Sequence, residues 1–252
     1  MKFDHLKPQF DRDGYVTVRQ LLSPADFADL NEQLDRYVRD VVPNLPPADA
    51  FYDSRTREPA SLKQLHRFTQ DPFFADYCKH PAWCALAEGL LGEPAEAQSP
   101  EWFNKPPMST AGTPPHQDNY YFNLNPCSVV TIWMALDPVD EENACMRYVP
   151  GSHAGPVRPH GRSSVLGFSQ GITDYGPEDA AHEVAVCLEP GDVTAHHGNL
   201  IHLACANRSR DRHRRAFAIV FKGESCRRDE VAYARYLAAL ETQHDELAVG
   251  KR

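Results

Sequence analysis

From about residue 96 onward, the sequence is built of short apolar or alternating runs separated by turn-forming residues. Apart from a short first run, each is four to eight residues long, and Gly, Pro, Asn or Asp borders most of them. This pattern is typical of an antiparallel β-sandwich or barrel. The runs cover residues 102–103, 129–136, 146–149, 182–188, 192–197 and 216–222. The 21 prolines against 14 glycines also favour short strands and stiff loops over long helices.

The part before residue 96 follows a helical pattern instead. Ser23 is placed as a capping residue, with Pro24 at the first helical position and Asp26 in the first turn. Apolar side chains then recur at spacings of three, four and four, at Phe27, Leu30, Leu34 and Val38. A short strand over residues 14–18 precedes this helix. A second helical region, with interruptions, is predicted from 61 to 91, and Gly92 is placed to end it.

These patterns predict one domain over residues 1–252. Residues 1–95 form a mostly helical part packed on the core, 96–225 form the catalytic β core, and 226–252 form a C-terminal helix. A chain of this length buries enough surface to need no disulfide or structural metal.

Charge and composition exclude several classes of partner. The net charge is −9 and the only dense basic run is 208–215, so nucleic acid is not expected. No apolar segment approaches the ~20 residues that span a bilayer, and the N-terminus lacks the apolar core of a signal peptide. The seven cysteines never form a Cys-x-x-Cys pair, which favours reduced thiols. We expect a cytoplasmic monomer or homodimer that acts on a small molecule.

The chemically most specific feature is the segment 114–118, Pro-Pro-His-Gln-Asp. In an extended segment His116 and Asp118 point to the same face, so both can reach one metal ion. Such a pair occurs by chance in many proteins, and a third ligand must come from a distant strand. Two histidines and one carboxylate on one face of a metal leave positions for a co-substrate and dioxygen, as in iron(II) oxygenases. The segment 191–202 offers three candidates: His196, His197 and His202.

These residues belong to a longer series of motifs that resembles the phytanoyl-CoA dioxygenase family of iron(II)- and 2-oxoglutarate-dependent oxygenases. The matching stretches are 104–107, 116–118 with 121–122, 133–137, 142–147, 150–153, 191–193, His202, Asn207 and 214–216, with a weaker match at 13–16. They occur in the family's order along the β half of the chain. The resemblance implies a mainly β fold with flanking α-helices around a double-stranded β-helix (jelly roll, cupin-like) core.

By the same resemblance, His116, Asp118 and His202 are the catalytic metal ligands, while His196 and His197 have structural or supporting roles. Arg214 is expected to anchor the distal carboxylate of 2-oxoglutarate through a bidentate guanidinium contact. Arg215 is the alternative if the register slips by one.

Other co-substrate contacts are expected at the positions where the family has them. Trp133 is expected to line the co-substrate pocket, with a core aromatic residue as the alternative. Lys63 is the nearest candidate for a family lysine that contacts 2-oxoglutarate. Ala204 stands where the family often has a hydroxyl residue, so that hydrogen bond is lost. His153, in the turn at 150–153, is expected to be structural.

The implied activity is that of a dioxygenase using Fe(II), 2-oxoglutarate and O2, with ascorbate as a supporting reductant. Because Asp118 is present, hydroxylation is favoured over halogenation, and we expect it at an unactivated C–H bond of a small or medium metabolite. Alternatives are an acyl-CoA or lipid hydroxylase, a non-catalytic jelly roll that binds metal or ligand, and a zinc hydrolase. Four residues could line the substrate pocket or belong to the core: Asn119, Tyr120, Tyr121 and Trp102.

Overall fold

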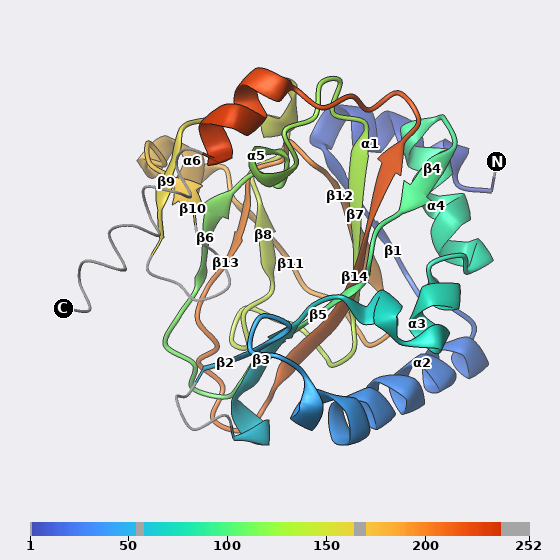
Figure 1. Ribbon diagram of the computed structural model, residues 1–252. Helices are drawn as coiled ribbons and strands as arrows, with labels where there is room; N and C mark the ends of the chain where they lie inside the picture. Colours follow the sequence, from blue (N-terminus) through green and yellow to red (C-terminus); the bar gives the residue numbers. More distant parts are fainter. Residues whose placement is uncertain (1, 54–57, 164–169, 238–252) are drawn as a thin grey trace.

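The computed structural model describes residues 2–53, 58–163 and 170–237, and consists of two facing antiparallel sheets with helices packed on one side (Figure 1). The helices before the C-terminal segment are α1 (Lys7–Asp13), α2 (Pro24–Arg36), α3 (Pro72–Tyr77), α4 (Pro81–Leu91), α5 (Asn119–Phe122) and α6 (Pro177–Ala181). The strands before residue 140 are β1 (Tyr15–Val18), β2 (Ala50–Tyr52), β3 (Leu62–Leu65), β4 (Ala95–Ala97), β5 (Glu101–Lys105), β6 (Thr113–His116) and β7 (Val129–Ala135). The later strands are β8 (Met146–Tyr148), β9 (His160–Arg162), β10 (Gln170–Ile172), β11 (Val184–Val186), β12 (Val193–His197), β13 (His202–Ala204) and β14 (Arg214–Gly223).

The larger sheet has the strand order β1-β12-β7-β14-β5-β3-β2, with β4 also paired to β14. The smaller sheet has the order β11-β8-β13-β6, and β9 and β10 form a separate ribbon. All of these pairs are antiparallel. The predicted fold class, mainly β with flanking helices, is therefore confirmed.

Strand β7 is buried on both of its faces, which explains why all of its residues except Thr131 are apolar. Because side chains alternate along a strand, Val130, Ile132 and Met134 point toward the helices. Trp133 and Ala135 point instead into the space between the two sheets. One strand thus belongs to two cores, a large one under the helices and a smaller one between the sheets.

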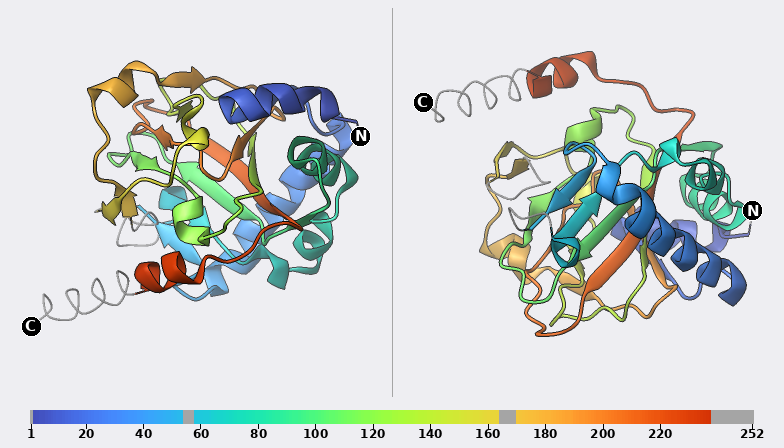
Figure 2. Two further views of the ribbon diagram at one scale, coloured as in Figure 1. Left: turned by 90° about the horizontal axis from the view of Figure 1, so that it is seen from above. Right: turned by 60° about the horizontal axis from the view of Figure 1, so that its bottom comes forward.

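Helices α1, α2, α3 and α4 cover the outer face of the larger sheet (Figures 1 and 2). Helix α2 begins as predicted, because the Ser23 side chain accepts a hydrogen bond from the Asp26 backbone N–H. Its apolar stripe buries Leu30 and Leu34. Gly92 ends α4 with a φ of +75°, a left-handed conformation that glycine adopts without strain.

The N-terminal part is less helical than predicted, since besides the expected β1 it contributes β2 and β3 to the larger sheet. The helical region expected over 61–91 begins instead with strand β3. All four residues of Leu62–Leu65 are buried, and Gln64 pairs with Phe103 on β5. Burial on both faces outweighs the weak helical preference of this stretch. The strand over 14–18 and the helix ending at Gly92 are confirmed.

The C-terminal helix is observed over residues 230–237. The rest of the predicted helix, including Leu240, lies outside the described residues. Tyr236 on this helix contacts Tyr120, with ring centroids 5.8 Å apart. Within the described ranges, no helix has the length and apolar character to span a bilayer.

Phe217 on β14 is the centre of the helix-side core. It is fully buried, and its ring packs at 5.7–6.2 Å against four aromatic rings from the helical part of the chain. These rings belong to Phe68, Phe74, Tyr77 and Trp83. The contact joins the helices to the sheet.

We expect Phe217→Ala to lower the free energy of unfolding by ~3–5 kcal/mol, the usual cost of deleting a buried aromatic ring. Phe217→Leu, which leaves a smaller cavity, is expected to cost less. Denaturant titration followed by circular dichroism measures both. Val184→Ala, at an exposed position on β11, is the control and should change stability by less than ~0.5 kcal/mol. A loss for Phe217→Ala no larger than that of the control would contradict this view of the core.

Candidate active site

A cavity of about 320 Å³ lies between the two sheets and holds most of the polar side chains singled out in the sequence. Its walls come from β3, β5, β7, β12 and β14 of the larger sheet and from β6, β8 and β13 of the smaller one. One part of the wall is formed by His116, Asp118 and His202, and another by Arg214, Lys105 and Lys63.

Strand pairing brings the two histidines together from distant parts of the chain. His202 on β13 lies directly opposite His116 on β6, and on its other side it lies opposite Tyr148 on β8. Side chains at directly opposite positions have Cβ atoms ~4.5–5.5 Å apart. The His116 and His202 ring centroids are 4.1 Å apart. Pairing alone therefore brings the two imidazoles side by side.

Asp118 completes a three-residue cluster with these imidazoles. One possible ligand atom from each of His116, Asp118 and His202 lies within 4.8 Å of the other two. Oδ1 of Asp118 is 3.6 Å from Nε2 of His116 and 3.6 Å from Nε2 of His202. Both histidines are almost completely buried.

The orientation of each imidazole is fixed by its other nitrogen. Nδ1 of His116 lies 2.8 Å from the Pro114 carbonyl oxygen, and Nδ1 of His202 lies 2.9 Å from the Leu200 carbonyl oxygen. A carbonyl oxygen only accepts, so each Nδ1 carries a proton, and in the neutral imidazole Nε2 then keeps its lone pair for a ligand. This is the usual outer support of a metal-binding histidine.

Asp118 reaches the cluster differently from the way the sequence predicted. An extended segment was expected, but Asp118 has helical backbone angles (φ −56°, ψ −35°) and begins the short helix α5. The Thr131 hydroxyl on β7 donates a 2.7 Å hydrogen bond to Oδ2 of Asp118. The turn and this hydrogen bond, rather than strand alternation, aim the carboxylate.

The protonation states of Asp118 and His202 are those that metal binding requires. Burial would raise the pKa of Asp118, but the neighbouring imidazoles, with that of His202 first, hold it well below its usual range. Burial, together with His116 and His196, holds the pKa of His202 well below its ordinary value. The carboxylate is therefore ionised and His202 is neutral at neutral pH. Two imidazole nitrogens and one carboxylate oxygen form a donor set that suits iron(II).

A second part of the cavity wall carries buried positive charge. Arg214 on β14 lies directly opposite Lys105 on β5, and both are almost completely buried. Among the described residues, neither forms an ion pair with a carboxylate, and Nε of Arg214 lacks a hydrogen-bond partner. Like charges at opposite positions repel each other. This arrangement therefore favours a bound anion between them.

Burial affects the two cations in the same direction. It lowers the pKa of the Arg214 guanidinium to about 10, which leaves it charged at neutral pH. Burial, followed by the charges of Arg214 and Lys63, lowers the pKa of Lys105 well below its usual value. The guanidinium carbon of Arg214 lies 5.3 Å from the centre of the Trp133 ring, within the range of a cation–π contact.

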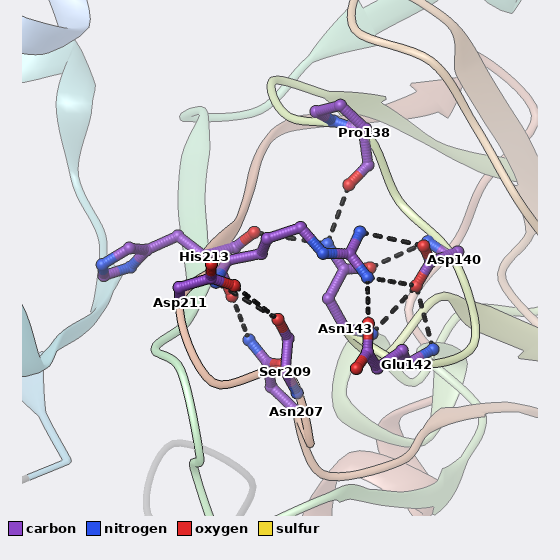
Figure 3. Close-up of polar contacts among 9 residues, drawn as sticks. Pro138, Asp140, Glu142, Asn143, Asn207, Ser209, Asp211 and His213 are labelled. Carbon is purple, nitrogen blue, oxygen red and sulfur yellow. Dashed lines mark hydrogen bonds and ion pairs between the residues drawn. The ribbon is translucent and has the colours of Figure 1, made fainter.

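The loop before Arg214 is fixed by a network of polar contacts (Figure 3). The Asn207 side-chain amide donates to the carbonyl oxygens of Lys105 at 2.8 Å and Arg212 at 2.7 Å. Arg212 in turn forms an ion pair with Asp140 at 2.8 Å. The Asn143 side chain donates to the carbonyl oxygen of His213 at 3.3 Å. These bonds define where β14 begins, and so which arginine enters the cavity.

Arg215 does not enter the cavity. Its guanidinium pairs with Asp137 at 2.7 Å, and its side chain is 40% exposed. Because neighbouring residues on a strand point to opposite faces, Arg214 and Arg215 cannot both line the cavity. Between the two alternatives left by the sequence, the orientation favours Arg214.

The other residues expected near the co-substrate or substrate divide into two groups. Trp133, Lys63 and Tyr121 line the cavity. Four others do not: Trp102, Asn119, Tyr120 and Ala204.

Each of these four lies outside the cavity wall for a local structural reason. Trp102 lies on β5 with its side chain in the helix-side core, and its neighbour Phe103 lines the cavity instead. The side chain of Asn119 bonds to the backbone of Leu124. Tyr120 stacks on His160, with ring centroids 4.1 Å apart. Ala204 packs between the sheets.

The remaining histidine candidates also separate. His196 is buried in the cavity wall beside His202, with ring centroids 4.4 Å apart. His197 points away from the cavity and packs on Phe10 and His153. Nε2 of His153 lies 3.1 Å from the Asp11 carbonyl oxygen, which agrees with its expected structural role.

Sequence reasoning gave no role to Lys105 or Thr131, which lie beside Arg214 and Asp118 in the site. Lys105 belongs to the Asn-Lys-Pro-Pro stretch that carries the family resemblance, but it was given no role. Thr131 is a polar residue in the otherwise apolar strand β7, and this interruption was the available signal.

Known proteins similar to this chain include phytanoyl-CoA dioxygenases and solved structures that contain 2-oxoglutarate. The family model described as phytanoyl-CoA dioxygenase matches residues 10–216. The peroxisomal phytanoyl-CoA dioxygenase of Bos taurus is 29% identical over 230 residues, covering 86% of this chain and 67% of the relative. That name refers to a peroxisomal protein, so the expected cytoplasmic location of this chain stays a prediction.

Solved structures with the same fold include two co-substrate complexes. EvdO2 of Micromonospora carbonacea var. aurantiaca, complexed with 2-oxoglutarate, is 26% identical with a TM-score of 0.70, covering 89% of this chain and 91% of that one. The epimerase SnoN, in complex with Fe3+, alpha ketoglutarate and nogalamycin RO, is 25% identical with a TM-score of 0.70, covering 89% and 85%. The match along most of the sequence confirms the resemblance, and this chain belongs to the phytanoyl-CoA dioxygenase family of 2-oxoglutarate-dependent dioxygenases.

Proposed function

We propose that this protein uses iron(II), 2-oxoglutarate and O2 to hydroxylate an unactivated C–H bond of a small or medium organic metabolite. The observation that carries this proposal is one cavity that holds both a two-histidine, one-carboxylate cluster and a buried guanidinium without an ion-pair partner among the described residues. Neither half alone is specific. Together they suit a ligand that chelates a metal at one end and carries a carboxylate at the other.

In this proposal His116, Asp118 and His202 hold the iron. Their lone pairs are directed at one point, because the backbone carbonyls of Pro114 and Leu200 orient the two imidazoles. When bound, iron(II) and 2-oxoglutarate supply the oxidising chemistry, in which O2 is activated and 2-oxoglutarate is converted to succinate and CO2. The protein's task is to hold the ligands and to leave open positions on the metal.

Arg214 is the proposed anchor of the distal carboxylate, with Lys105 beside it. A guanidinium binds a carboxylate through two parallel hydrogen bonds and keeps its charge when buried. The two neighbouring positive charges support this role. The bound anion would relieve the repulsion between Arg214 and Lys105, which are opposite each other across β14 and β5.

The rest of the cavity wall is suited to an organic substrate. Aromatic side chains line it at Phe103, Tyr121 and Phe122, and a polar pair lies near them, with Nδ1 of His66 2.5 Å from Oε1 of Glu101. Such a wall offers apolar contact together with a few hydrogen-bonding groups. An acyl-CoA or lipid substrate is the alternative within the same family. A non-catalytic role is disfavoured because the cluster is complete.

The first test is co-substrate binding and turnover. With Fe(II) and 2-oxoglutarate under anaerobic conditions, the protein is expected to show a visible metal-to-ligand charge-transfer band, and in air with ascorbate to release succinate. His202→Ala is expected to do neither, because one of three ligands is lost. The control is His197→Ala, since His197 points away from the cavity. If folded His197→Ala lost the band while His202→Ala kept it, the assigned third ligand would be wrong.

The second test separates the two arginines. Arg214→Gln is expected to weaken 2-oxoglutarate binding about 10- to 100-fold, because a charge-assisted hydrogen bond contributes ~1.5–3 kcal/mol. Arg215→Gln is the matched control and should keep the affinity within about threefold, since its partner Asp137 lies outside the cavity. Calorimetric titration of the Mn(II)-loaded proteins measures both affinities. Loss confined to Arg215→Gln would reverse the assignment.

The third test concerns Lys105, whose folded-state pKa is lowered by burial. In the unfolded chain the lysine is protonated below pH ~10.4, whereas the folded protein disfavours its charged form. Lys105 therefore lowers the free energy of unfolding at every pH below that value. Lys105→Met is therefore expected to raise the free energy of unfolding of the ligand-free protein at pH 7, by an amount that shrinks as the pH approaches 10. The same change is expected to weaken 2-oxoglutarate binding. A destabilised variant with unchanged affinity would make Lys105 structural, through its bond to the Ala111 carbonyl oxygen.

A further inference from the structure

The two carboxylate oxygens of Asp118 have different surroundings. Oδ1 lies 3.6 Å from Nε2 of both His116 and His202. Oδ2 accepts the Thr131 hydrogen bond and lies 3.4 Å from Nε2 of His196. One oxygen is thus directed at the two imidazoles of the cluster, while the other is directed at strands β7 and β12.

His196 is held in place at its opposite edge. The side chain is about 1% exposed, and its Nδ1 lies 3.1 Å from the Tyr148 hydroxyl. Tyr148 is itself buried and stacks on Tyr15, with ring centroids 4.6 Å apart. Nε2 of His196 is buried without a well-formed hydrogen bond to any described residue. The ring is therefore fixed on one side, and its free nitrogen faces the Asp118 carboxylate.

Hydrogen-bonding rules determine which way the proton must point. An ionised carboxylate only accepts, so Nε2 of His196 must donate if the two groups interact. In a neutral imidazole that leaves Nδ1 as an acceptor, and the Tyr148 hydroxyl can donate to it. Tyr148 thereby selects the tautomer that supports Asp118.

The position of His196 argues against its being a fourth metal ligand. It lies on β12 opposite Thr131 on β7, the same residue that donates to Oδ2. The set of ligand atoms that lie within 4.8 Å of one another contains His116, Asp118 and His202, but not His196. His196 therefore contacts the outer side of the carboxylate.

We propose that His196 is a positioning residue that, with Thr131, holds Oδ2 of Asp118 away from the iron, so that Asp118 binds through Oδ1 alone. This inference rests on the proposed function, because a carboxylate bound through both oxygens would occupy a position that the co-substrate or O2 requires. Tyr148 supports the arrangement by fixing the tautomer of His196.

The experiment compares two substitutions at this position. His196→Phe keeps a planar ring but removes the donor, whereas His196→Gln keeps an amide donor. Calorimetry measures the affinity for Co(II), and then the affinity of the Co(II) protein for 2-oxoglutarate. Partners that orient metal ligands typically contribute about 10- to 100-fold, so His196→Phe is expected to weaken 2-oxoglutarate binding at least tenfold. Its Co(II) affinity should fall less than that of His202→Ala, and His196→Gln should recover most of the loss.

Two controls distinguish positioning from packing. His197→Phe changes the neighbouring histidine on the outer face of β12 and is expected to leave both affinities unchanged. The Co(II) d–d absorption spectrum without 2-oxoglutarate is expected to change in His196→Phe and not in His197→Phe, because only the former removes one of the two groups that hold Oδ2.

Each contrary result is informative. Loss of Co(II) binding in His196→Phe equal to that of His202→Ala would make His196 a ligand. Equal losses in the Phe and Gln variants would assign it to packing, and unchanged affinities with an unchanged spectrum would remove its role. Failure of the proposed function would appear in the wild-type protein, as absent 2-oxoglutarate binding. The Co(II) spectra would then still decide the role of His196.

Discussion

The pairing of β6 with β13 is the constraint on which the site depends. It places His116 directly opposite His202, although 85 residues separate them in the sequence. Two buried imidazoles and a largely buried carboxylate are then brought together. Burying such groups is costly unless they are hydrogen-bonded or bind a metal. The backbone carbonyls satisfy each Nδ1, which leaves the Nε2 atoms and Oδ1 of Asp118 directed at one another. A cation bound between these atoms would therefore offset the free-energy cost of burying them.

The larger sheet supplies the other half of the site because its strands are fixed from behind. The aromatic residues around Phe217 hold β14 against the helices, and β7 lies beside it in full register over seven residue pairs. The inward side chains of these two strands, which include Thr131, Trp133 and Arg214, are then fixed as a group. Packing on the outer face thus determines positions on the inner face. The rigid helix-side core is a structural condition for a preorganised cavity.

Much of the fold could be predicted from the sequence, but the direction of individual side chains could not. Most core strands were predicted because short apolar stretches bordered by turn residues indicate a strand whichever of its faces is buried. Trp102 and Phe103 show the limit, since only the second lines the cavity. A strand with two buried faces has no polar side to set its register. The strand β3 was missed for the same reason, because four buried residues in a row carry no alternation.

The same ambiguity applies to pairs of identical neighbours, and there it has chemical consequences. Arg214 and Arg215 are indistinguishable in composition, yet one is buried in the cavity and the other pairs with Asp137. His196 and His197 differ in the same way, because only His196 reaches the Asp118 carboxylate. In both pairs the register of the strand decides which residue points into the cavity. Hydrogen bonds from Asn207 and Asn143 define the start of β14, and the pairing of His196 with Thr131 defines the register for β12.

The distribution of charge in the cavity then restricts what can bind. At the metal cluster the protein provides one carboxylate among several imidazoles, so a divalent cation there retains net positive charge. Where Arg214 lies opposite Lys105, the protein provides buried cations without a carboxylate partner among the described residues. A neutral ligand would leave the positive charge at the metal cluster and the positive charge at Arg214 uncompensated. A ligand with an anionic group for each compensates both, and 2-oxoglutarate has this form. The charges at these two places thus favour a dicarboxylate on grounds that are independent of any sequence motif.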